Sequence, residues 1–388
     1  MTGAARVGIL TYSTKPRGGV VHALSLAEAL AKQGVAVHVF GLGPVDGTFY
    51  RPTTVPFTLF PAPEGASTLD EKVFASVDAM ADGLRTLAGE FDLLHSQDCI
   101  SARAATRVRD DGVAVPVLRT VHHVDDFTTA ALIDCQRQAI LQPDRILVVS
   151  RRWREIMRDE YGRDAEIVHN GVDPGRFAPI SEARRAGLRA TVGAGDRPVL
   201  LSIGGIEPRK GSVELFEALS ILKARGRDPL LVMLGGHSFQ DYAAYRQAAL
   251  DRLPELGLAS GDDIVELGTV DEETLAAWFR AADVLAFPSV KEGFGLVALE
   301  AQAAELPVVA SSIEVFAEFL QDGVNAMLPQ VADPVAIADA LEQVLLDGQL
   351  RARLVRGGLE VVPRFSWAAS ASRHREIYQE TLAGDPGQ

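Results

Sequence analysis

The sequence is poor in cysteine and has no long apolar run. Cys99 and Cys135 are the only cysteines, which excludes a disulfide framework, and we expect both as reduced thiols. No CxxC motif or His/Cys cluster with metal-ligand spacing occurs, which argues against a zinc site. No stretch approaches about 18 consecutive apolar residues, so we expect no transmembrane helix. The first residues, MTGAARVGILTYS, lack the pattern of a signal peptide, and we expect a cytoplasmic protein.

The sequence also has fewer basic than acidic residues. The chain has 38 Lys and Arg against 52 Asp and Glu, a net charge of -14. A surface this acidic repels phosphate backbones, so nucleic acid is not expected as a partner. One segment, 151–158, carries four arginines beside Trp153 and could meet an anionic membrane. Interspersed acidic residues favour an ordinary solvated face instead, and the oligomeric state stays open.

What the 388 residues do contain is a regular alternation of short apolar runs and longer amphipathic stretches. The chain is long enough for two or three domains. The apolar runs predict buried strands at 5–12, 35–40, 91–96, 115–121, 145–150, 199–205, 230–236, 263–268, 284–289 and 307–312. The amphipathic stretches predict helices near 20–33, 99–111, 151–161, 212–225, 272–282, 295–304 and 333–347.

This alternation predicts an α/β protein with parallel, doubly wound sheets, because parallel strands need crossover connections. Turn-forming residues near 173–197 mark a boundary between two halves of similar size. Such sheets bind ligands beyond the carboxyl ends of their strands. We therefore expect functional residues in the loops that follow strands, at a cleft between the two halves.

Two loops in the first half carry polar or glycine residues after a predicted strand. Gly18 and Gly19 precede a helix whose free amide groups could approach an anion, although the GxGxxG spacing of dinucleotide sites is lacking. His122 and His123 follow another strand, where a histidine can bind a substrate hydroxyl or carry protons. The adjoining Asp125 and Asp126 could bind polyols, but no third metal ligand is evident. A tight turn and satisfied loop histidines are the structural alternatives.

Two loops in the second half carry charged residues. Arg209 and Lys210 stand just before a predicted helix, and paired cations beside free amide groups suit a diphosphate. Glu292 precedes a helix expected to start around Phe294, where a carboxylate could bind sugar hydroxyls. Glu300 lies in an otherwise apolar helix and needs hydrogen-bond donors if buried, for which ribose hydroxyls are suitable. Solvated side chains are the alternative for each.

Taken in order, these residues resemble a known family. The segments GGVVH (18–22), TVHH (120–123), NGVD (170–173), EPRKG (207–211) and EGFGLVALE (292–300) are similar to those of family-four retaining glycosyltransferases of the GT-B fold. The likeness runs nearly end to end and includes the C-terminal FSW segment. It implies two Rossmann-like domains facing a cleft. The first would be an acceptor-binding domain of residues 1–178 with a crossover helix in 365–388, and the second a sugar-nucleotide domain of residues 179–364.

The resemblance also implies roles for individual residues. Glu292 would hold hydroxyls of the donor sugar, Glu300 would hold the ribose, and Arg209 with Lys210 would neutralise the diphosphate. His122 would lie over the donor sugar, and Gly18 and Gly19 would lie under the phosphate and acceptor. The remaining residues expected to bind the donor are Gly204, Gly293, Phe294, Gly295 and Leu296.

Three positions depart from the family pattern. Gly205 occupies a place where many members have arginine, and Arg209 would supply the charge instead. Glu305 occupies a place where glycine is common, so the turn there is expected to differ. His123 stands where an acidic residue is common, which leaves open which histidine faces the donor.

We expect no cofactor and no metal, because no DxD pair occurs and cationic side chains with helix dipoles can stabilise a leaving diphosphate. The donor is expected to be a UDP- or GDP-sugar and the partner a hydroxyl-bearing acceptor. Two alternatives remain: another enzyme on this fold, such as a sugar-nucleotide epimerase or a pyridoxal-type phosphorylase, and a non-catalytic sugar-nucleotide-binding protein. No lysine stands out as a Schiff-base residue.

Overall fold

The computed structural model describes residues 5–235 and 242–384, which form two compact units. One unit comprises Met1–Gly171 and Ser366–Gln388, and the other comprises Val172–Phe365. The chain thus enters the second unit after Gly171 and returns to the first at Ser366. Gly236, at the end of the expected strand 230–236, lies outside the described residues. So do 385–388 of the expected crossover segment and residues 1–4.

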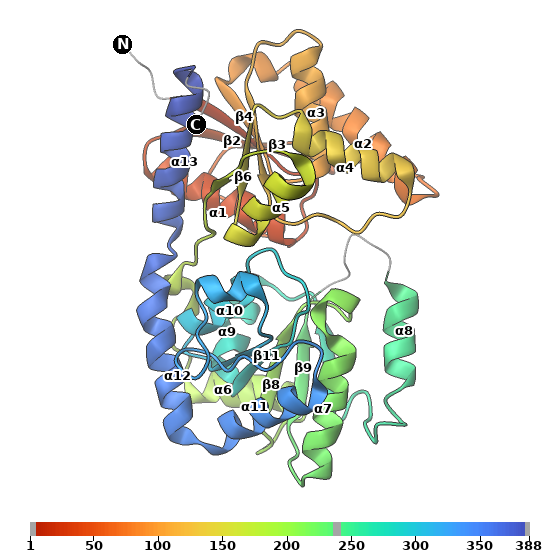
Figure 1. The fold of residues 1–388 in the computed structure, drawn as a ribbon, viewed down its shortest axis with the longest axis vertical. Coiled ribbons are helices and arrows are strands. Elements are labelled where there is room, and N and C mark those ends of the chain that lie inside the picture. Colours follow the sequence, from red (N-terminus) through yellow and green to blue (C-terminus); the bar gives the residue numbers. More distant parts are fainter. Residues whose placement is uncertain (1–4, 236–241, 385–388) are drawn as a thin grey trace. The chain divides into compact units, whose positions relative to one another are not determined.

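The first unit contains a parallel sheet in the order β3-β2-β1-β4-β5-β6-β7 (Figure 1). Its strands are β1 (Arg6–Leu10), β2 (Ala36–Gly43), β3 (Phe57–Pro61), β4 (Leu93–Ser96), β5 (Val117–Val121), β6 (Arg145–Val148) and β7 (Glu166–Ile167). Its helices are α1 (Gly18–Lys32), α2 (Leu69–Leu84), α3 (Cys99–Asp110), α4 (Ala130–Leu141), α5 (Arg151–Tyr161) and α13 (Trp367–Leu382). This is the doubly wound order, in which the connections change direction between β1 and β4.

The second unit has a parallel sheet of the same topology with fewer strands, in the order β10-β9-β8-β11-β12. Its strands are β8 (Val199–Ile203), β9 (Leu230–Leu234), β10 (Ile264–Gly268), β11 (Val284–Phe287) and β12 (Val308–Ala310). Its helices are α6 (Glu182–Thr191), α7 (Ser212–Ala224), α8 (Ala243–Asp251), α9 (Glu272–Ala281), α10 (Leu296–Ala303), α11 (Pro334–Leu346) and α12 (Gly348–Val361). The connections here change direction between β8 and β11.

The strand and helix predictions are confirmed in their main lines. Each of the ten predicted strands and seven predicted helices has a counterpart, with ends shifted by a few residues. The sequence pattern does not predict the strands β3 and β7, and both lie at edges of the sheet. It does not predict the helices α2, α4, α8 and α12 either. An edge strand with one paired neighbour shows a weaker apolar run, and β7 is only two residues long.

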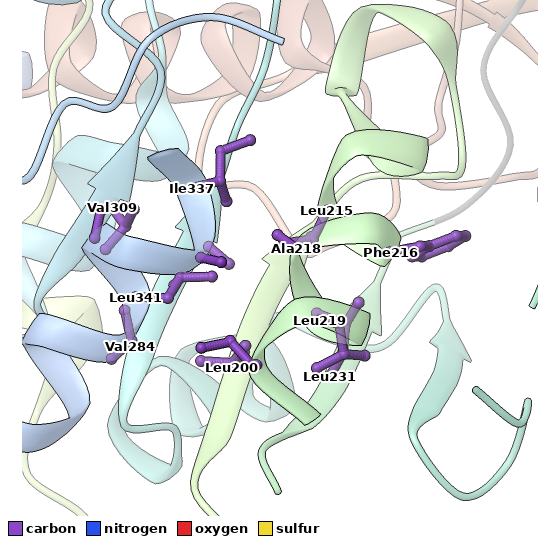
Figure 2. Close-up of a cluster of buried hydrophobic side chains, with 14 of the residues drawn as sticks. Leu200, Leu215, Phe216, Ala218, Leu219, Leu231, Val284, Val309, Ile337 and Leu341 are labelled. Carbon is purple, nitrogen blue, oxygen red and sulfur yellow. The ribbon is translucent and has the colours of Figure 1, made fainter. Parts of the chain in front are cut away.

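A continuous apolar core holds the second unit together. Central strands such as β9 and β11 are buried along their whole length, because helices cover both faces of a parallel sheet. Figure 2 shows Leu215 and Leu219 of α7 and Leu341 of α11 around Leu200 of β8. Burying one such leucine contributes about 1.5–3 kcal/mol relative to leaving it exposed. The core thereby fixes the carboxyl ends of β8 and β11.

The C-terminal helix α13 is part of the first unit and packs beside α1 (Figure 1). Tyr378 and Ile377 lie in the same apolar cluster as Leu24 of α1. The Nε2 group of Gln33 donates to the carbonyl of Ala368 at 2.8 Å. A Cβ atom on Gly171 would lie only 2.3 Å from the backbone nitrogen of Trp367, so glycine is needed at this contact. The NGVD and FSW segments of the sequence are therefore neighbours in the fold.

The turn after α10 corrects one sequence expectation. Glu305 replaces the glycine common in the family, and this replacement predicts a different turn. Glu305 instead adopts the left-handed conformation that glycine favours, with a φ of 56°. Its amide donates to the carbonyl of Gln302 at 3.1 Å, and its carboxylate pairs with Arg280 at 2.9 Å. The hydrogen bonds of the helix end are kept at a backbone cost of about 1–2 kcal/mol.

Candidate active site

In the second unit, the predicted charged residues follow two adjacent strands. Arg209 and Lys210 lie in the single turn of 3-10 helix Pro208–Lys210, in the connection after β8. Glu292 lies in the loop after β11, which pairs with β8 in parallel. Because β8 and β11 are also where the connections change direction, their carboxyl ends form the usual ligand site of an open α/β sheet.

These residues form one compact ionic cluster. The Nζ atom of Lys210 lies 2.6 Å from Oε1 of Glu292, and Nη1 of Arg209 lies 3.5 Å from the same oxygen. The hydroxyl of Ser289 also donates to Oε1 of Glu292, at 2.9 Å. The Nε atom of Arg209 lies 3.0 Å from the buried carboxylate of Glu207. Two cations are therefore paired with two carboxylates, so the formal charges of this cluster sum to zero before any anionic ligand binds.

Burial sets the behaviour of the central pair. The side chains of Lys210 and Glu292 are only 13% and 10% exposed. Burial lowers the pKa of Lys210, and the adjacent Glu292 offsets part of this effect. Burial also opposes ionisation of Glu292, but Lys210 and Arg209 outweigh it, so the pKa of Glu292 is lowered. Arg209 is 40% exposed and is therefore the cation most available to a ligand.

Two glycines allow the close packing of this cluster. Gly211 has a φ of +65°, and a Cβ atom there would lie 2.1 Å from the carbonyl oxygen of Pro288. A Cβ atom on Gly204 would lie 3.0 Å from Cε of Lys210, so this predicted residue lines the lysine stem. The connection after β8 can thereby approach the chain that follows β11, and this brings Lys210 to Glu292.

Helix α10 begins slightly later than predicted, at Leu296, with Gly295 at its N-cap position. Among the described residues, no side chain caps this helix end. The amide groups of its first turn and the positive end of its dipole therefore suit an anion. Phe294 is buried and stacks on Phe319 with ring centroids 5.1 Å apart, so its side chain anchors the loop. Gly293, between Glu292 and Phe294, is partly exposed.

Glu300 has a hydrogen-bond donor that the sequence reasoning missed. Its Oε1 atom lies 3.2 Å from Nη1 of Arg176, which also pairs with Glu272. The Glu300 side chain is 12% exposed. Burial raises the pKa of Glu300 to about 7, Arg176 opposes the shift, and Glu272 adds to it. Burial of Glu300 therefore does not by itself require donors from a ligand, because the chain supplies Arg176.

In the first unit, the predicted residues gather around His122. His122 follows β5, and its Nε2 atom lies 3.0 Å from Oε1 of Gln97, which follows β4. A Cβ atom on Gly19 would lie 3.4 Å from the backbone carbonyl oxygen of Gln97 and 3.8 Å from Cδ2 of His122. Gly18, at the start of α1, has open space beside it, since none of the described atoms lies within 4 Å of where a Cβ atom would be. The amino end of α1 and His122 thus lie next to each other.

Three further histidines surround His122, and the sequence alone assigns a role to none of them. The rings of His22 and His122 meet edge to face with centroids 4.6 Å apart. His22 contacts His374 at 6.0 Å, and His374 contacts His95 at 5.4 Å. Burial lowers the pKa of His22 to about 3 and that of His374 to about 4. The pKa values of His95 and His122 also fall well below the ordinary value, chiefly through burial.

His123 and the two aspartates lie apart from this histidine group. The His123 side chain is 56% exposed, and its Nε2 atom lies 3.2 Å from Oδ1 of Asp125. Asp126 is also exposed. Across residues 5–235 and 242–384, no three or more His, Cys, Asp or Glu side chains are arranged to hold a metal ion. Of the two histidines, His122 is the one that lies beside Gly19.

The basic helix α5 is largely paired with acidic residues. Arg152 pairs with Glu155, Arg154 with Asp164, and Arg158 with Asp159. Trp153 is 4% exposed and belongs to the interior. These contacts support the ordinary solvated face over a membrane-binding one. No helix in the described part of the chain is long and apolar enough to cross a membrane.

Sequence reasoning missed Gln97, Arg176, Glu207 and Ser289. Gln97 and Ser289 both come directly after or at the end of predicted strands, and this position was the available signal. Arg176 lies six residues after Asn170 of the NGVD segment, too far from Glu300 in sequence for pairing to be foreseen. Glu207 lies two residues before Arg209, inside the segment that stands out for its cations.

Comparisons with known proteins agree with this arrangement. Residues 16–176 match the model of "Glycosyltransferase Family 4", and residues 187–361 match that of "Glycosyl transferases group 1". The chain is 30% identical to a D-inositol 3-phosphate glycosyltransferase of Xylanimonas cellulosilytica, covering 100% of this chain and 99% of that protein. It is 31% identical to the protein of the same name from Saccharomonospora viridis, covering 96% of this chain and 92% of that one.

Solved structures show the same fold at lower identity. Sucrose-phosphate synthase from Thermosynechococcus elongatus superposes with a TM-score of 0.80 at 22% identity, over 98% of this chain and 100% of that one. The Anabaena protein HepE in complex with UDP and glucose superposes with a TM-score of 0.81 at 19% identity. That match covers 97% of this chain and 100% of HepE.

Proposed function

The chain belongs to glycosyltransferase family 4 and has the GT-B fold, and from this membership we propose a retaining transfer of a sugar from a nucleotide-diphosphate sugar to an acceptor hydroxyl. One observation carries the proposal: Arg209, Lys210 and Glu292 cluster at the carboxyl ends of β8 and β11. Helix α10, which no side chain caps within residues 5–235 and 242–384, follows immediately, so cations and amide groups converge where a diphosphate would bind.

The second unit would hold the donor. Arg209, as the more exposed cation, would bind the diphosphate together with the amides of Gly295 and Leu296. Lys210 would act as a fixed positive charge between the phosphate and Glu292. Glu292 would accept hydrogen bonds from sugar hydroxyls, and Glu300 from the ribose. The other expected lining residues are Gly204, Gly293 and the backbone of Phe294.

The first unit would hold the acceptor and the reacting face of the sugar. Gly18 and Gly19 leave the amino end of α1 open to a ligand, and His122 lies beside Gly19. Relatives of this chain are named for D-inositol 3-phosphate, a phosphorylated polyol. An acceptor of this class combines hydroxyls with an anion, and it is therefore the first acceptor to assay.

The reaction would proceed on one face of the sugar. The bond between the anomeric carbon and the diphosphate oxygen breaks, and the acceptor oxygen bonds to the same face of that carbon. The acceptor proton passes to the departing phosphate oxygen. The residues would contribute mainly by stabilising the negative charge that develops on the leaving diphosphate. Arg209, Lys210 and the dipole of α10 stand where such stabilisation is needed.

We propose that transfer needs no divalent metal, since the more exposed cation Arg209 and the amide groups at the start of α10 could stabilise the diphosphate instead. Activity in the presence of a chelator should match activity without it. Loss of transfer with a chelator and its return with Mg²⁺ or Mn²⁺ would contradict this part of the proposal.

The test of the donor assignment is thermal stabilisation by nucleotides. UDP, GDP, ADP and dTDP are added to the wild-type protein and to Glu300→Ala. A ligand at 100 times its Kd stabilises a protein by about 2.7 kcal/mol, which moves the melting temperature by a few degrees. We expect a shift with UDP or GDP that is weakened in the variant.

Intact UDP- and GDP-sugars with inositol phosphate then test transfer itself. Formation of a glycoside with the anomeric configuration of the donor supports the proposal, and inversion contradicts it. Binding of a sugar nucleotide with no turnover for any acceptor would identify a binding protein instead. Interconversion of sugars without an acceptor would identify an epimerase.

A further inference from the structure

His122 stands at one end of a chain of buried hydrogen bonds. Its Nε2 atom contacts Oε1 of Gln97 at 3.0 Å. The Nε2 group of Gln97 contacts Nε2 of His95 at 3.3 Å, and Nδ1 of His95 contacts the hydroxyl of Tyr378 at 2.7 Å. The hydroxyl of Thr120 lies 2.8 Å from Nε2 of His95 as well. Gln97, His95, Thr120 and Tyr378 are all at most 3% exposed.

The chemistry of the amide sets the direction of these bonds. A glutamine carbonyl only accepts and its NH₂ group only donates, so Gln97 accepts from Nε2–H of His122 and donates to Nε2 of His95. In this amide orientation His95 carries its proton on Nδ1, and the hydroxyl of Tyr378 accepts from it. The opposite amide orientation would require the opposite tautomer at both histidines. One buried amide thus couples the two rings.

The surroundings of His122 disfavour a charged ring. Burial lowers the pKa of His122, and His22, His123, His95 and Arg119 lower it further. These groups belong to α1, the loop after β5, β4 and β5 respectively. His22 is itself held by Asn170, which accepts from its Nδ1 atom at 2.7 Å, and it packs edge to face on His122. Both the ring orientation and the neutral state of His122 are therefore supported by neighbours.

We propose that Gln97 is a positioning residue that holds His122 as the neutral Nε2–H tautomer. This leaves Nδ1 of His122 as a hydrogen-bond acceptor, and within the described residues Nδ1 has no partner. A neutral acceptor of this kind receives a hydrogen bond from a substrate hydroxyl and does not deliver a proton to it. The inference rests on the proposed function for the role of His122, but the tautomer itself can be measured without substrate.

The first experiment measures the tautomer in the free full-length protein. Long-range proton–nitrogen correlation spectra of isotopically labelled histidine distinguish the two neutral tautomers and the imidazolium. The signals of His122 are assigned by their loss in His122→Asn. We expect Nε2–H at His122 in the wild type and a mixture of tautomers in Gln97→Met. An Nδ1–H tautomer in the wild type overturns the proposal, whatever reaction the protein catalyses.

The second experiment follows transfer against pH. In Gln97→Glu the carboxylate still accepts from Nε2–H, but its charge raises the pKa of His122. We expect Gln97→Glu to lose activity as the pH falls, because a protonated His122 has no acceptor atom. The wild type should show no such acidic limb. An identical pH profile for the two proteins contradicts the proposal.

Gln97→Met and a control separate positioning from simple loss of stability. Gln97→Met should lower kcat/KM about tenfold to hundredfold, by analogy with partners that orient metal-binding histidines. Gln97→Glu should restore part of that loss at high pH. The control is Gln136→Met, since Gln136 is a buried glutamine bonded to the backbone of Asp125 at 2.8 and 3.0 Å. It should leave the tautomer of His122 and the shape of the pH profile unchanged. An acidic limb or a tautomer change in the control would show that any lost glutamine has this effect.

If no sugar nucleotide is a substrate, the pH experiment has no readout and the proposed function fails, while the tautomer measurement still decides the inference. If transfer occurs but His122 is the other tautomer, only the inference fails.

Discussion

The two units share one strand order but differ in the electrostatics of their candidate sites. In each unit the candidate site residues follow strands at or next to the point where the connections change direction, namely β1, β4 and β5 in one unit and β8 and β11 in the other. The second unit places ion pairs there, with Lys210 bonded to Glu292. The first unit instead has histidines whose pKa values are lowered by burial, with His122, after β5, bonded to Gln97, after β4. Under the proposed function, one strand order would support a charged site for a diphosphate and a neutral hydrogen-bonding site for hydroxyls.

The largest effect is expected from breaking the ion pair of the second unit. Lys210→Met leaves the carboxylate of Glu292 buried without its closest cation. The variant should lose about 3–5 kcal/mol of unfolding free energy. Its transfer activity should fall about 100-fold or more. Urea unfolding and steady-state kinetics measure the two losses.

The double variant Lys210→Met with Glu292→Gln is the control for this loss of stability. It should regain most of the free energy of unfolding and none of the activity. Equal stability of the single variant and the wild type would show that the pair contributes little.

The pH dependence of stability should differ between wild type and Glu300→Gln. The folded protein raises the pKa of Glu300 from 4.5 to about 7, so the native state holds a proton that the unfolded chain releases. Stability should therefore fall as the pH rises through this window, by on the order of 3 kcal/mol from this group. Denaturant unfolding at a series of pH values between 4.5 and about 7 measures how the free energy of unfolding changes with pH. This pH dependence should be weaker in Glu300→Gln.

The same measurement sharpens the contrast with the first unit. His22 and His374 have lowered pKa values, near 3 and 4, so the unfolded chain binds protons more readily there. Their contribution to stability is present above the ordinary value of 6.5 and is lost as the pH falls toward the folded values. A Glu300→Gln slope identical to that of the wild type would rule out Glu300 as the source.

Alanine in place of one glycine from each unit should separate folding from binding. Gly211→Ala places a Cβ atom 2.1 Å from a carbonyl oxygen at a positive φ and should destabilise the protein by at least about 2 kcal/mol. Gly19→Ala meets nothing closer than 3.4 Å, so its melting temperature should stay near that of the wild type. Its KM for the acceptor should rise, because the methyl group projects toward His122. Thermal melting measures the stability of both variants, and acceptor kinetics measure the KM of Gly19→Ala. An equal loss of stability in the two variants would contradict the expected difference between them.

The smallest effect is expected at Glu300 of α10 and its partner Arg176. Arg176→Gln removes the cation 3.2 Å from Glu300 and should weaken binding of UDP or GDP about tenfold, or about 1.4 kcal/mol. Titration calorimetry measures this loss. The matched test uses the 2′-deoxy nucleotide, whose affinity should change less in the variant, since it lacks one hydroxyl that Glu300 would bind. Equal losses for both nucleotides would place Arg176 outside ribose recognition.

Much of the fold could be predicted because the governing signals are local. Buried parallel strands such as β9 show as uninterrupted apolar runs, and helices such as α1 and α11 show as the 3.6-residue period. The left-handed turn at Glu305 could not be predicted, because residue preference favours glycine there. The neighbouring hydrogen bonds and the pairing with Arg280 hold the turn instead.

The candidate site was only half visible in the sequence. Positions after strands pointed to Arg209, Lys210, Glu292 and His122, since the carboxyl ends of parallel strands meet at one edge. The partners of these residues were not foreseen. Lys210 and Glu292 are 82 residues apart, Arg176 and Glu300 are 124 apart, and His95 and Tyr378 are 283 apart.

The sequence by itself therefore determined the class of fold, the loops that carry polar residues and the family to which the motifs belong. Only the tertiary structure decided which charges pair with each other, which histidines have pKa values lowered by burial and which amide bonds to His122. The physical reason is that apolar periodicity and turn chemistry act over a few residues. Burial and electrostatic pairing depend instead on neighbours that folding brings together from distant parts of the chain.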